Sequence, residues 1–317
     1  MNDNEVLTAL ASLINNASNN KGISFDLAFN NFYSYSKLNC RPATLEYYNK
    51  IYRILQRTLD QLGITNTNQI TKASYKVLET TFRSHGYKNS SINKFTDLLK
   101  MIFKVNNELE YIHYNPVANI KKLRENPPEI EIISKTNMTK IMKYIDGLPK
   151  TYQYIRKKIC LLLLKDTGVR INELLHLKTE NIDIDNNTIY LDYTKTHDAR
   201  YVFFTDSTKL VLKEYILIKP VPEEPYIDYL FINDKCTDIM SKHVIYHFFE
   251  EISNACGIEQ SISPHKWRHT FITELVENNV NLTSIMKVAG HTEFNTTKKY
   301  IHQSLTNLKE SILSIKK

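Results

Sequence analysis

The sequence has 317 residues, 42% of them hydrophobic, and a net charge of +7, which suits two domains with ordinary packed cores. It has no run of about 18 apolar residues and no basic start followed by an apolar segment, so we expect neither a membrane span nor a signal peptide. The four cysteines are far apart and the seven glycines form no nucleotide-binding pattern, which argues against a zinc site, a disulfide framework or a glycine-rich phosphate cradle. The cysteine usage favours a reducing cytoplasm.

The excess positive charge lies in the first part of the chain. Residues 1–125 contain 16 Lys and Arg and 10 Asp and Glu, a net +6, whereas residues 126–317 contain 25 and 24, a net +1. A basic domain beside a nearly neutral one indicates a polyanionic partner, most often nucleic acid. A well-solvated surface is the alternative explanation.

The first third of the chain predicts an arm followed by a helical bundle. Residues 1–21 are rich in Asn, and we expect a mobile arm or a single helix there. Residues 22–124 carry apolar side chains at steps of three and four, which predicts helices. The three stripes are Leu45, Tyr48, Ile51, Leu55, Leu59 and Leu62; Tyr75, Leu78 and Phe82; and Ile92, Phe95, Leu99, Ile102 and Phe103. Gly63 and Gly86 mark helix ends, and Asn115-Pro116 breaks the pattern.

Residues 125–132 are the expected linker, because two successive prolines in Asn126-Pro127-Pro128 cannot continue a helix. A second domain should then occupy residues 133–317. Its helices are expected at 136–146, 152–165, 207–218 and 241–256, with a further helix starting at Ser263-Pro264. Two strands are expected at 188–193 and 201–204, separated by the polar turn 194–200.

Three polar clusters in this second domain could act on a phosphate. They are TGVRINELL at 167–175, PHKWRHTF at 264–271, and Gly290-His291 followed nine residues later by Tyr300. His265 and Arg268 are three apart on an expected helix, so their side chains point the same way. Arginine binds two phosphate oxygens at once and stays charged. Tyr300 would supply an oxygen nucleophile, whose proton is removed more easily beside positive charge.

Each cluster alone is common by chance, but their joint order and spacing resemble the tyrosine recombinases, which include phage integrases and Xer resolvases. The resemblance covers nearly the whole chain from residue 22 and is strongest over 160–205 and 263–302. It assigns the catalytic residues to Arg170, Lys195, His265, Arg268, His291 and Tyr300, with Tyr300 as the nucleophile. It also implies that Glu173 braces Arg170. The nearest departure is Ala289, where many members have Leu.

Several residues had competing interpretations. Lys195 lies in the turn between the two expected strands, where the family has its lysine, while Lys165 and Lys178 fall in helical contexts. Arg200 is a further candidate for a phosphate contact. His269 is expected to be a buried partner behind the catalytic residues, and Trp267 is expected in the core.

The resemblance implies a mostly α fold with a small antiparallel β-sheet. The N-terminal part would be a SAM-like, core-binding helical bundle at 22–124, and the mixed α/β catalytic domain would follow at 133–317. The implied reaction forms a 3′-phosphotyrosyl bond with DNA and needs neither a metal nor another cofactor. The implied partner is double-stranded DNA with a specific recombination site, bound by a homo-tetramer that dissociates to monomers when free.

Two other functions remain open at this point. A type IB topoisomerase uses similar residues, although the helical N-terminal domain favours a recombinase. A non-catalytic DNA-binding protein on the same scaffold is the alternative from another class. Only about 21 residues precede the bundle, too few for an extra arm-binding domain, so we expect a simple two-domain enzyme. The sequence leaves open an element integrase or a chromosome-dimer resolvase, and does not reveal the DNA target.

The last residues predict a tail helix at about 303–317. Leu305, Leu308, Ile312 and Ile315 line one face, and Asn307, Glu310, Ser314 and Lys317 the other. A helix this short needs a surface on which to bury its apolar face. The family resemblance favours donation to a neighbouring protomer in the assembled complex; docking on its own domain is the alternative.

Overall fold

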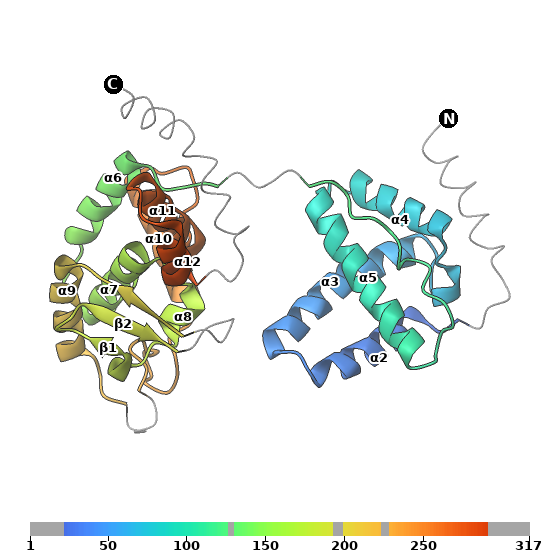
Figure 1. The fold of residues 1–317 in the computed structure, drawn as a ribbon, viewed down its shortest axis with the longest axis horizontal. Coiled ribbons are helices and arrows are strands. Elements are labelled where there is room, and N and C mark those ends of the chain that lie inside the picture. Colours follow the sequence, from blue (N-terminus) through green and yellow to red (C-terminus); the bar gives the residue numbers. More distant parts are fainter. Residues whose placement is uncertain (1–21, 126–129, 193–198, 223–227, 291–317) are drawn as a thin grey trace. The chain divides into compact units, whose positions relative to one another are not determined.

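The computed structural model describes residues 22–125, 130–192, 199–222 and 228–290. The expected arm at 1–21, Lys195, and the segment from His291 to Lys317 with its tail helix lie outside the described residues. The chain divides into two compact units between Pro127 and Pro128 (Figure 1).

The first unit is a bundle of α-helices. Its helices are α2 (Phe25–Lys37), α3 (Pro42–Gln61), α4 (Lys72–Ser84) and α5 (Asn89–Glu108), with a short 3₁₀ turn at Thr67–Gln69. The predicted stripes supply the core, because Leu55, Leu59, Leu99 and Ile102 are all buried. The sequence pattern had not singled out α2. Ser24 caps that helix by accepting a hydrogen bond from the N–H of Leu27.

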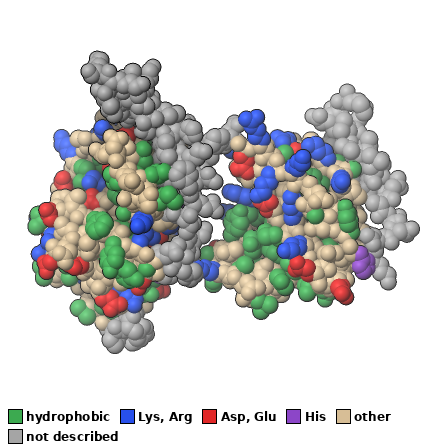
Figure 2. Space-filling model, in the orientation of Figure 1, with side chains coloured by type: hydrophobic (Ala, Val, Ile, Leu, Met, Phe, Trp, Pro, Cys, Tyr) green, Lys and Arg blue, Asp and Glu red, His purple; other side chains and the backbone are tan. Residues whose placement is uncertain are grey.

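Contacts within the bundle tie α2 to the helices around it. The ring of Phe29 stacks on Tyr52 of α3, with centroids 3.7 Å apart. The buried side chain of Asn106 donates to the carbonyl of Ala28 at 2.8 Å and accepts from Asn31 at 2.9 Å. Figure 2 shows Lys and Arg side chains spread over the upper part of this unit, with few acidic side chains among them.

The second unit combines helices with a small sheet. The helices are α6 (Lys135–Asp146), α7 (Tyr152–Thr167), α8 (Ile171–Leu175), α9 (Asp206–Ile218), α10 (Lys242–Cys256), α11 (Pro264–Glu277) and α12 (Leu282–Ala289). The strands β1 (Ile182–Asp183), β2 (Thr188–Leu191) and β3 (Arg200–Phe203) form an antiparallel sheet in the order β1-β2-β3. The predicted fold class, mostly helical with a small antiparallel sheet, is confirmed; β1 and α12 had not been predicted.

Helix α7 lies at the centre of this unit. Its residues from Ile159 to Leu164 are all buried, and it packs against α9 and α11. A helix with so wide an apolar surface is stable only when neighbours cover it. Because α7 is enclosed, the residue that ends it, Gly168, is fixed relative to α11.

Strands β2 and β3 are paired as far as the end of their hairpin. Leu191 pairs with Arg200 at the end of this hairpin, and Lys195 lies between them in the sequence. Within the described ranges, no helix is long and apolar enough to cross a membrane.

Candidate active site

Arg170 stands at the junction of α7 and α8. Helix α7 ends at Gly168, whose φ of 58° is in the left-handed region. Arg170 is the N-cap residue of α8, and its backbone N–H donates to Oε2 of Glu173 at 3.0 Å. The Arg170 guanidinium donates from Nη1 to Oε1 of the same carboxylate at 2.8 Å. Glu173 therefore holds both the backbone and the side chain of Arg170.

Glu173 has a second arginine partner, Arg200 at the start of β3. Arg200 donates to both carboxylate oxygens, from Nη2 at 2.7 Å and from Nη1 at 3.2 Å. The Glu173 side chain is only 3% exposed. Burial alone would raise the pKa of Glu173, but hydrogen bonds and positive charge from Arg200, then Arg170, outweigh burial and lower that pKa. Glu173 is thus held as a carboxylate between two cations.

Arg268 comes from α11. Its side chain is buried, and Nη1 donates to the carbonyl of Gly168 at 2.8 Å. Nη2 donates to the carbonyl of Ala289 at the end of α12. Helix α11 begins at Pro264, with Ser263 accepting from the N–H of Lys266 as its cap. This start sets the rotation of the helix and so the direction in which Arg268 points.

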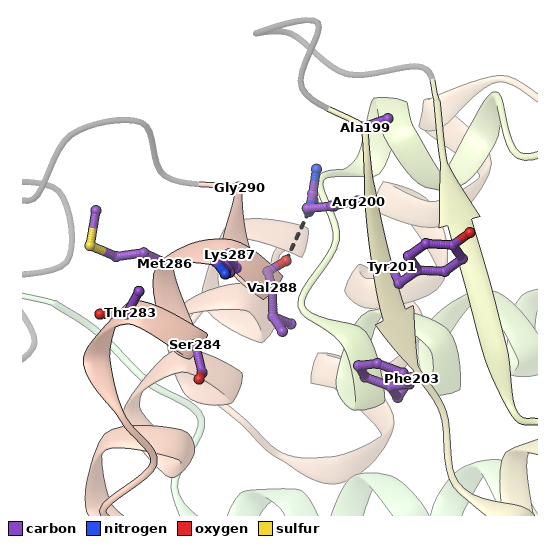
Figure 3. A pocket seen from close by; sticks show the side chains of 10 residues that line it. All are labelled: Ala199, Arg200, Tyr201, Phe203, Thr283, Ser284, Met286, Lys287, Val288 and Gly290. Carbon is purple, nitrogen blue, oxygen red and sulfur yellow. Dashed lines mark hydrogen bonds between the residues drawn. The ribbon is translucent and has the colours of Figure 1, made fainter.

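The C-terminal end of α12 accepts hydrogen bonds from three arginines on three different elements. Arg200 Nε donates to the carbonyl of Val288 at 2.8 Å (Figure 3), Arg268 to that of Ala289, and Arg170 Nη2 to that of Gly290 at 3.1 Å. The end of a helix carries unsatisfied carbonyls and a partial negative charge, which cations stabilise. The three guanidinium groups therefore converge immediately before residue 291.

His265 precedes Arg268 by one helical turn, and its side chain is exposed at the edge of this cluster. Partial desolvation, followed by the charges of Arg268 and Arg170, lowers the pKa of His265 from its usual value. The shift favours the neutral imidazole, which can exchange a proton or hydrogen-bond with a bound phosphate. The ring of His269, which is only partly buried, has its centroid 6.5 Å from that of His265.

The structure thus brings together four of the predicted site residues, Arg170, Glu173, His265 and Arg268. Lys195, His291 and Tyr300 lie outside the described residues. The competing lysines each have an acidic neighbour: Lys165 contacts Asp166 at 3.0 Å, and Lys178 contacts Glu180 at 3.2 Å. Trp267 is 1% exposed and belongs to the core.

Arg200 differs from the sequence-based interpretation. The sequence makes it a candidate for a phosphate contact, but all three of its guanidinium nitrogens donate within the protein: Nη1 and Nη2 bind the Glu173 carboxylate, and Nε binds the carbonyl of Val288. One sequence signal could have found this arrangement. Arg200 lies two residues before the buried Val202, and alternate residues of a strand share a face. That spacing places Arg200 on the inward face of the sheet.

The part of the chain that the structure describes contains no group of three or more His, Cys, Asp and Glu side chains arranged to hold a metal ion. The positively charged groups gathered here are three arginines, and one carboxylate, Glu173, lies between two of them. Guanidinium groups recognise carboxylates and phosphates through paired N–H donors. The chemistry that this cluster supports best is therefore the binding of a phosphate.

The profile of the phage integrase family matches residues 131–306, more than half of the chain. The chain belongs to the phage integrase family. Among curated members of the family, the probable integrase/recombinase of Acholeplasma phage L2 is 26% identical over 290 residues, which cover 89% of this chain and 94% of the phage protein. Tyrosine recombinase XerA of Saccharolobus solfataricus is 31% identical over 212 residues, 67% of this chain and 65% of the archaeal protein.

Solved structures of integrases share the fold of this family member. The Tn1549 transposon integrase in complex with circular intermediate DNA has a TM-score of 0.66 at 21% identity, covering 85% of this chain and 93% of the integrase chain. A lambda integrase dimer bound to a core site has a TM-score of 0.69 at 15% identity, covering 92% and 80%.

Proposed function

We propose that this chain is a site-specific tyrosine recombinase that cuts and rejoins double-stranded DNA through a 3′-phosphotyrosyl intermediate. The observation that carries the proposal is the convergence of Arg170 and Arg268 at the end of α12, with His265 beside them. Membership of the phage integrase family supports the reaction. The Tn1549 and lambda integrases, both solved with DNA, support DNA as the substrate.

In the proposed reaction, the Tyr300 hydroxyl attacks the scissile phosphorus and the bond from phosphorus to the 5′ oxygen breaks. Lys195 protonates the leaving 5′ oxygen. In the second step, the 5′ hydroxyl of another DNA end attacks the phosphotyrosyl bond and releases Tyr300. One ester bond forms as another breaks in each step, so the reaction requires no ATP.

Arg170 and Arg268 would bind the non-bridging oxygens of this phosphate, and His265 and His291 would assist by hydrogen bonding and proton transfer. A guanidinium has five N–H donors, and in Arg170 one binds Glu173 and another binds Gly290. The Arg170 side chain keeps 27% of its surface exposed, so a phosphate can reach its outer edge. The fixed cations would stabilise the charge that develops in the transition state, without a metal ion or another cofactor.

The test is a suicide substrate with a nick near the cleavage point, which releases a short strand and traps a covalent intermediate. The wild-type chain should form an adduct that survives a denaturing gel. Tyr300→Phe, which removes one oxygen atom, should bind the same DNA and form none. An adduct that persists in Tyr300→Phe would assign the nucleophile to another residue.

The same assay separates the alternatives. A DNA-binding protein without catalytic activity would form no adduct even as the wild type. A type IB topoisomerase would relax any supercoiled plasmid, whereas a site-specific recombinase should act only on plasmids that carry its site. Sequencing the DNA beside the gene would distinguish an element integrase from a chromosome-dimer resolvase.

We also propose that the active assembly is a homo-tetramer on two duplexes in the cytoplasm, formed from free monomers, in which the tail at 303–317 docks on a neighbouring protomer. Its apolar residues, Leu305, Leu308, Ile312 and Ile315, would be covered there. Deleting residues 304–317 should leave site binding by one protomer intact and abolish synapsis. Recombination at the wild-type rate after this deletion would contradict the proposed coupling.

A further inference from the structure

Arg200 connects two parts of the site that are far apart in the sequence. It is paired with Glu173, 27 residues before it, and with the carbonyl of Val288, 88 residues after it. Figure 3 shows its side chain extending from β3 toward the end of α12, where the hydrogen bond to Val288 forms. An open groove of about 790 Å³ lies between the two elements, and Arg200 lines it and reaches across to α12.

The geometry of the ion pair indicates that Arg200 is the main partner of Glu173. Two Arg200 nitrogens face the two carboxylate oxygens, whereas Arg170 reaches the carboxylate with one guanidinium nitrogen and its backbone N–H. The Arg200 side chain is 8% exposed, against 27% for Arg170. Arg200 thus faces the protein interior, and Arg170 keeps an edge toward solvent.

The space beside Gly290 shows how closely Arg200 fits. A Cβ on Gly290 would lie 2.8 Å from Nη1 of Arg200, and Gly290 has a φ of 65°. A glycine is therefore favoured at the end of α12 both for its backbone conformation and for the approach of Arg200.

We propose that Arg200 is a positioning residue, which holds Glu173, and through it Arg170, in fixed relation to the C-terminal end of α12. This inference rests on the proposed recombinase function, because the segment that follows α12 carries His291 and Tyr300. Arg200 would not touch the DNA. It would set the geometry between the arginine that binds the phosphate and the chain segment that bears the nucleophile.

The first test measures single-turnover cleavage of the nicked substrate at saturating DNA. Arg200→Gln should lower the rate about 100-fold, the cost of a small displacement of reacting groups, with little change in site affinity. Arg200→Lys keeps the positive charge, but the single side-chain nitrogen of lysine cannot bind Glu173 and Val288 as the guanidinium does. The cleavage rate of Arg200→Lys should therefore lie between those of the wild type and Arg200→Gln. A wild-type rate in either variant would overturn the bridging role.

A matched control separates positioning from general stability. Arg156 in α7 is also a buried arginine, 2% exposed, that donates to a carbonyl, that of Ile232 at 2.8 Å, and to a carboxylate, that of Asp234 at 2.7 Å. Arg156→Gln should lower the melting temperature as Arg200→Gln does and leave the cleavage rate of the folded protein unchanged. If the two variants lose cleavage equally, the loss in Arg200→Gln is explained by lower stability and not by positioning.

Two further measurements follow the proposed connection itself. Glu173→Gln and Arg200→Gln together should cost little more cleavage than either alone, because residues that act as a unit are not additive. Backbone hydrogen exchange at the end of α12 should accelerate in Arg200→Gln but not in Arg156→Gln. The hydrogen-exchange measurement requires no enzymatic activity, so it separates the two proposals. If the wild type forms no adduct with DNA, the proposed function fails. If exchange at the end of α12 is unchanged in Arg200→Gln, the proposed role of Arg200 is wrong.

Discussion

Gly168 lies against the ring of Phe271, so closely that a Cβ on Gly168 would overlap the ring carbon Cδ1. The same glycine ends α7 with a positive φ, and its carbonyl accepts from Arg268. Backbone conformation, packing and the proposed phosphate site thus depend on one position without a side chain.

Gly168→Ala should therefore destabilise the protein more than an ordinary replacement of a helix-ending glycine. Gly257 is the matched control, because it ends α10 with a φ of 61°, and within the part of the chain that the structure describes a Cβ added there would have no neighbour within 4 Å. Gly257→Ala should cost about 1–2 kcal/mol from the left-handed backbone alone. Gly168→Ala should cost about 1–3 kcal/mol more from overpacking. Urea unfolding measures the free energy of unfolding of both variants. An equal loss of stability in Gly168→Ala and Gly257→Ala would contradict the role of Phe271.

The lowered pKa of Glu173 predicts a loss of stability in acid. Desolvation opposes the shift, but Arg200 and Arg170 outweigh it, so the folded pKa lies below 4.5. Such a group contributes stability that is fully present above the unfolded pKa and is lost as pH falls through the folded value. The free energy of unfolding should therefore decline below pH 4.5, and less steeply in Glu173→Gln. A wild-type profile in Glu173→Gln would contradict the assignment.

A row of cations on α3 is a candidate DNA contact of the first unit. Lys50, Arg53 and Arg57 are exposed and spaced three and four residues apart, so they share one face of the helix. Replacing all three by Gln should weaken site binding and reduce the slope of log affinity against log salt by up to about 3, one counterion for each phosphate contact. The triple variant Lys50→Arg, Arg53→Lys and Arg57→Lys keeps the charge and should keep the slope. An unchanged slope in the Gln variant would place the contact elsewhere.

Lys195 is predicted to be the general acid, from its place in the sequence between β2 and β3. Lys195→Ala should slow cleavage of ordinary DNA by about 100-fold or more. A substrate with sulfur at the bridging 5′ position has a leaving group that needs no proton, so cleavage by Lys195→Ala should recover on it. If cleavage of the sulfur substrate stays as slow, Lys195 has another role. Lys165→Ala and Lys178→Ala serve as controls and should cleave ordinary DNA at the wild-type rate.

The long helices and the two main strands could be predicted from the sequence because the patterns that specify them lie in neighbouring residues. The stripe from Leu45 to Leu62 and the following glycine match α3 and its end, and Ser263-Pro264 starts α11 as expected. The predicted strands match β2 and β3 to within two residues. Apolar periodicity and capping residues are properties of neighbouring positions, so a single sequence is enough to reveal them.

The missed features depend on distant contacts. Strand β1 has two residues, too few to show alternation, and α12 has eight, of which only Ile285 and Ala289 are buried. The two-residue spacing from Arg200 to Val202 indicates an inward face, but it does not reveal that Glu173 and Val288 are the partners of Arg200. Spacing in the sequence identified Arg170, His265 and Arg268 as a set, but the partners that fix them required the fold.

The three arginines at the end of α12 also bear on how the protein is made. Arg170, Arg200 and Arg268 have all been synthesised before the carbonyls of Val288, Ala289 and Gly290 that they bind. Those contacts span 120, 88 and 21 residues of sequence, and contacts between distant residues form slowly because a long loop must close first. A chain still emerging from the ribosome therefore has its arginines before it has the helix end that orders them. The cluster is complete only once Val288, Ala289 and Gly290 have been made, and Tyr300 follows Gly290 by ten residues. An unfinished chain therefore carries no assembled site with which to cut DNA.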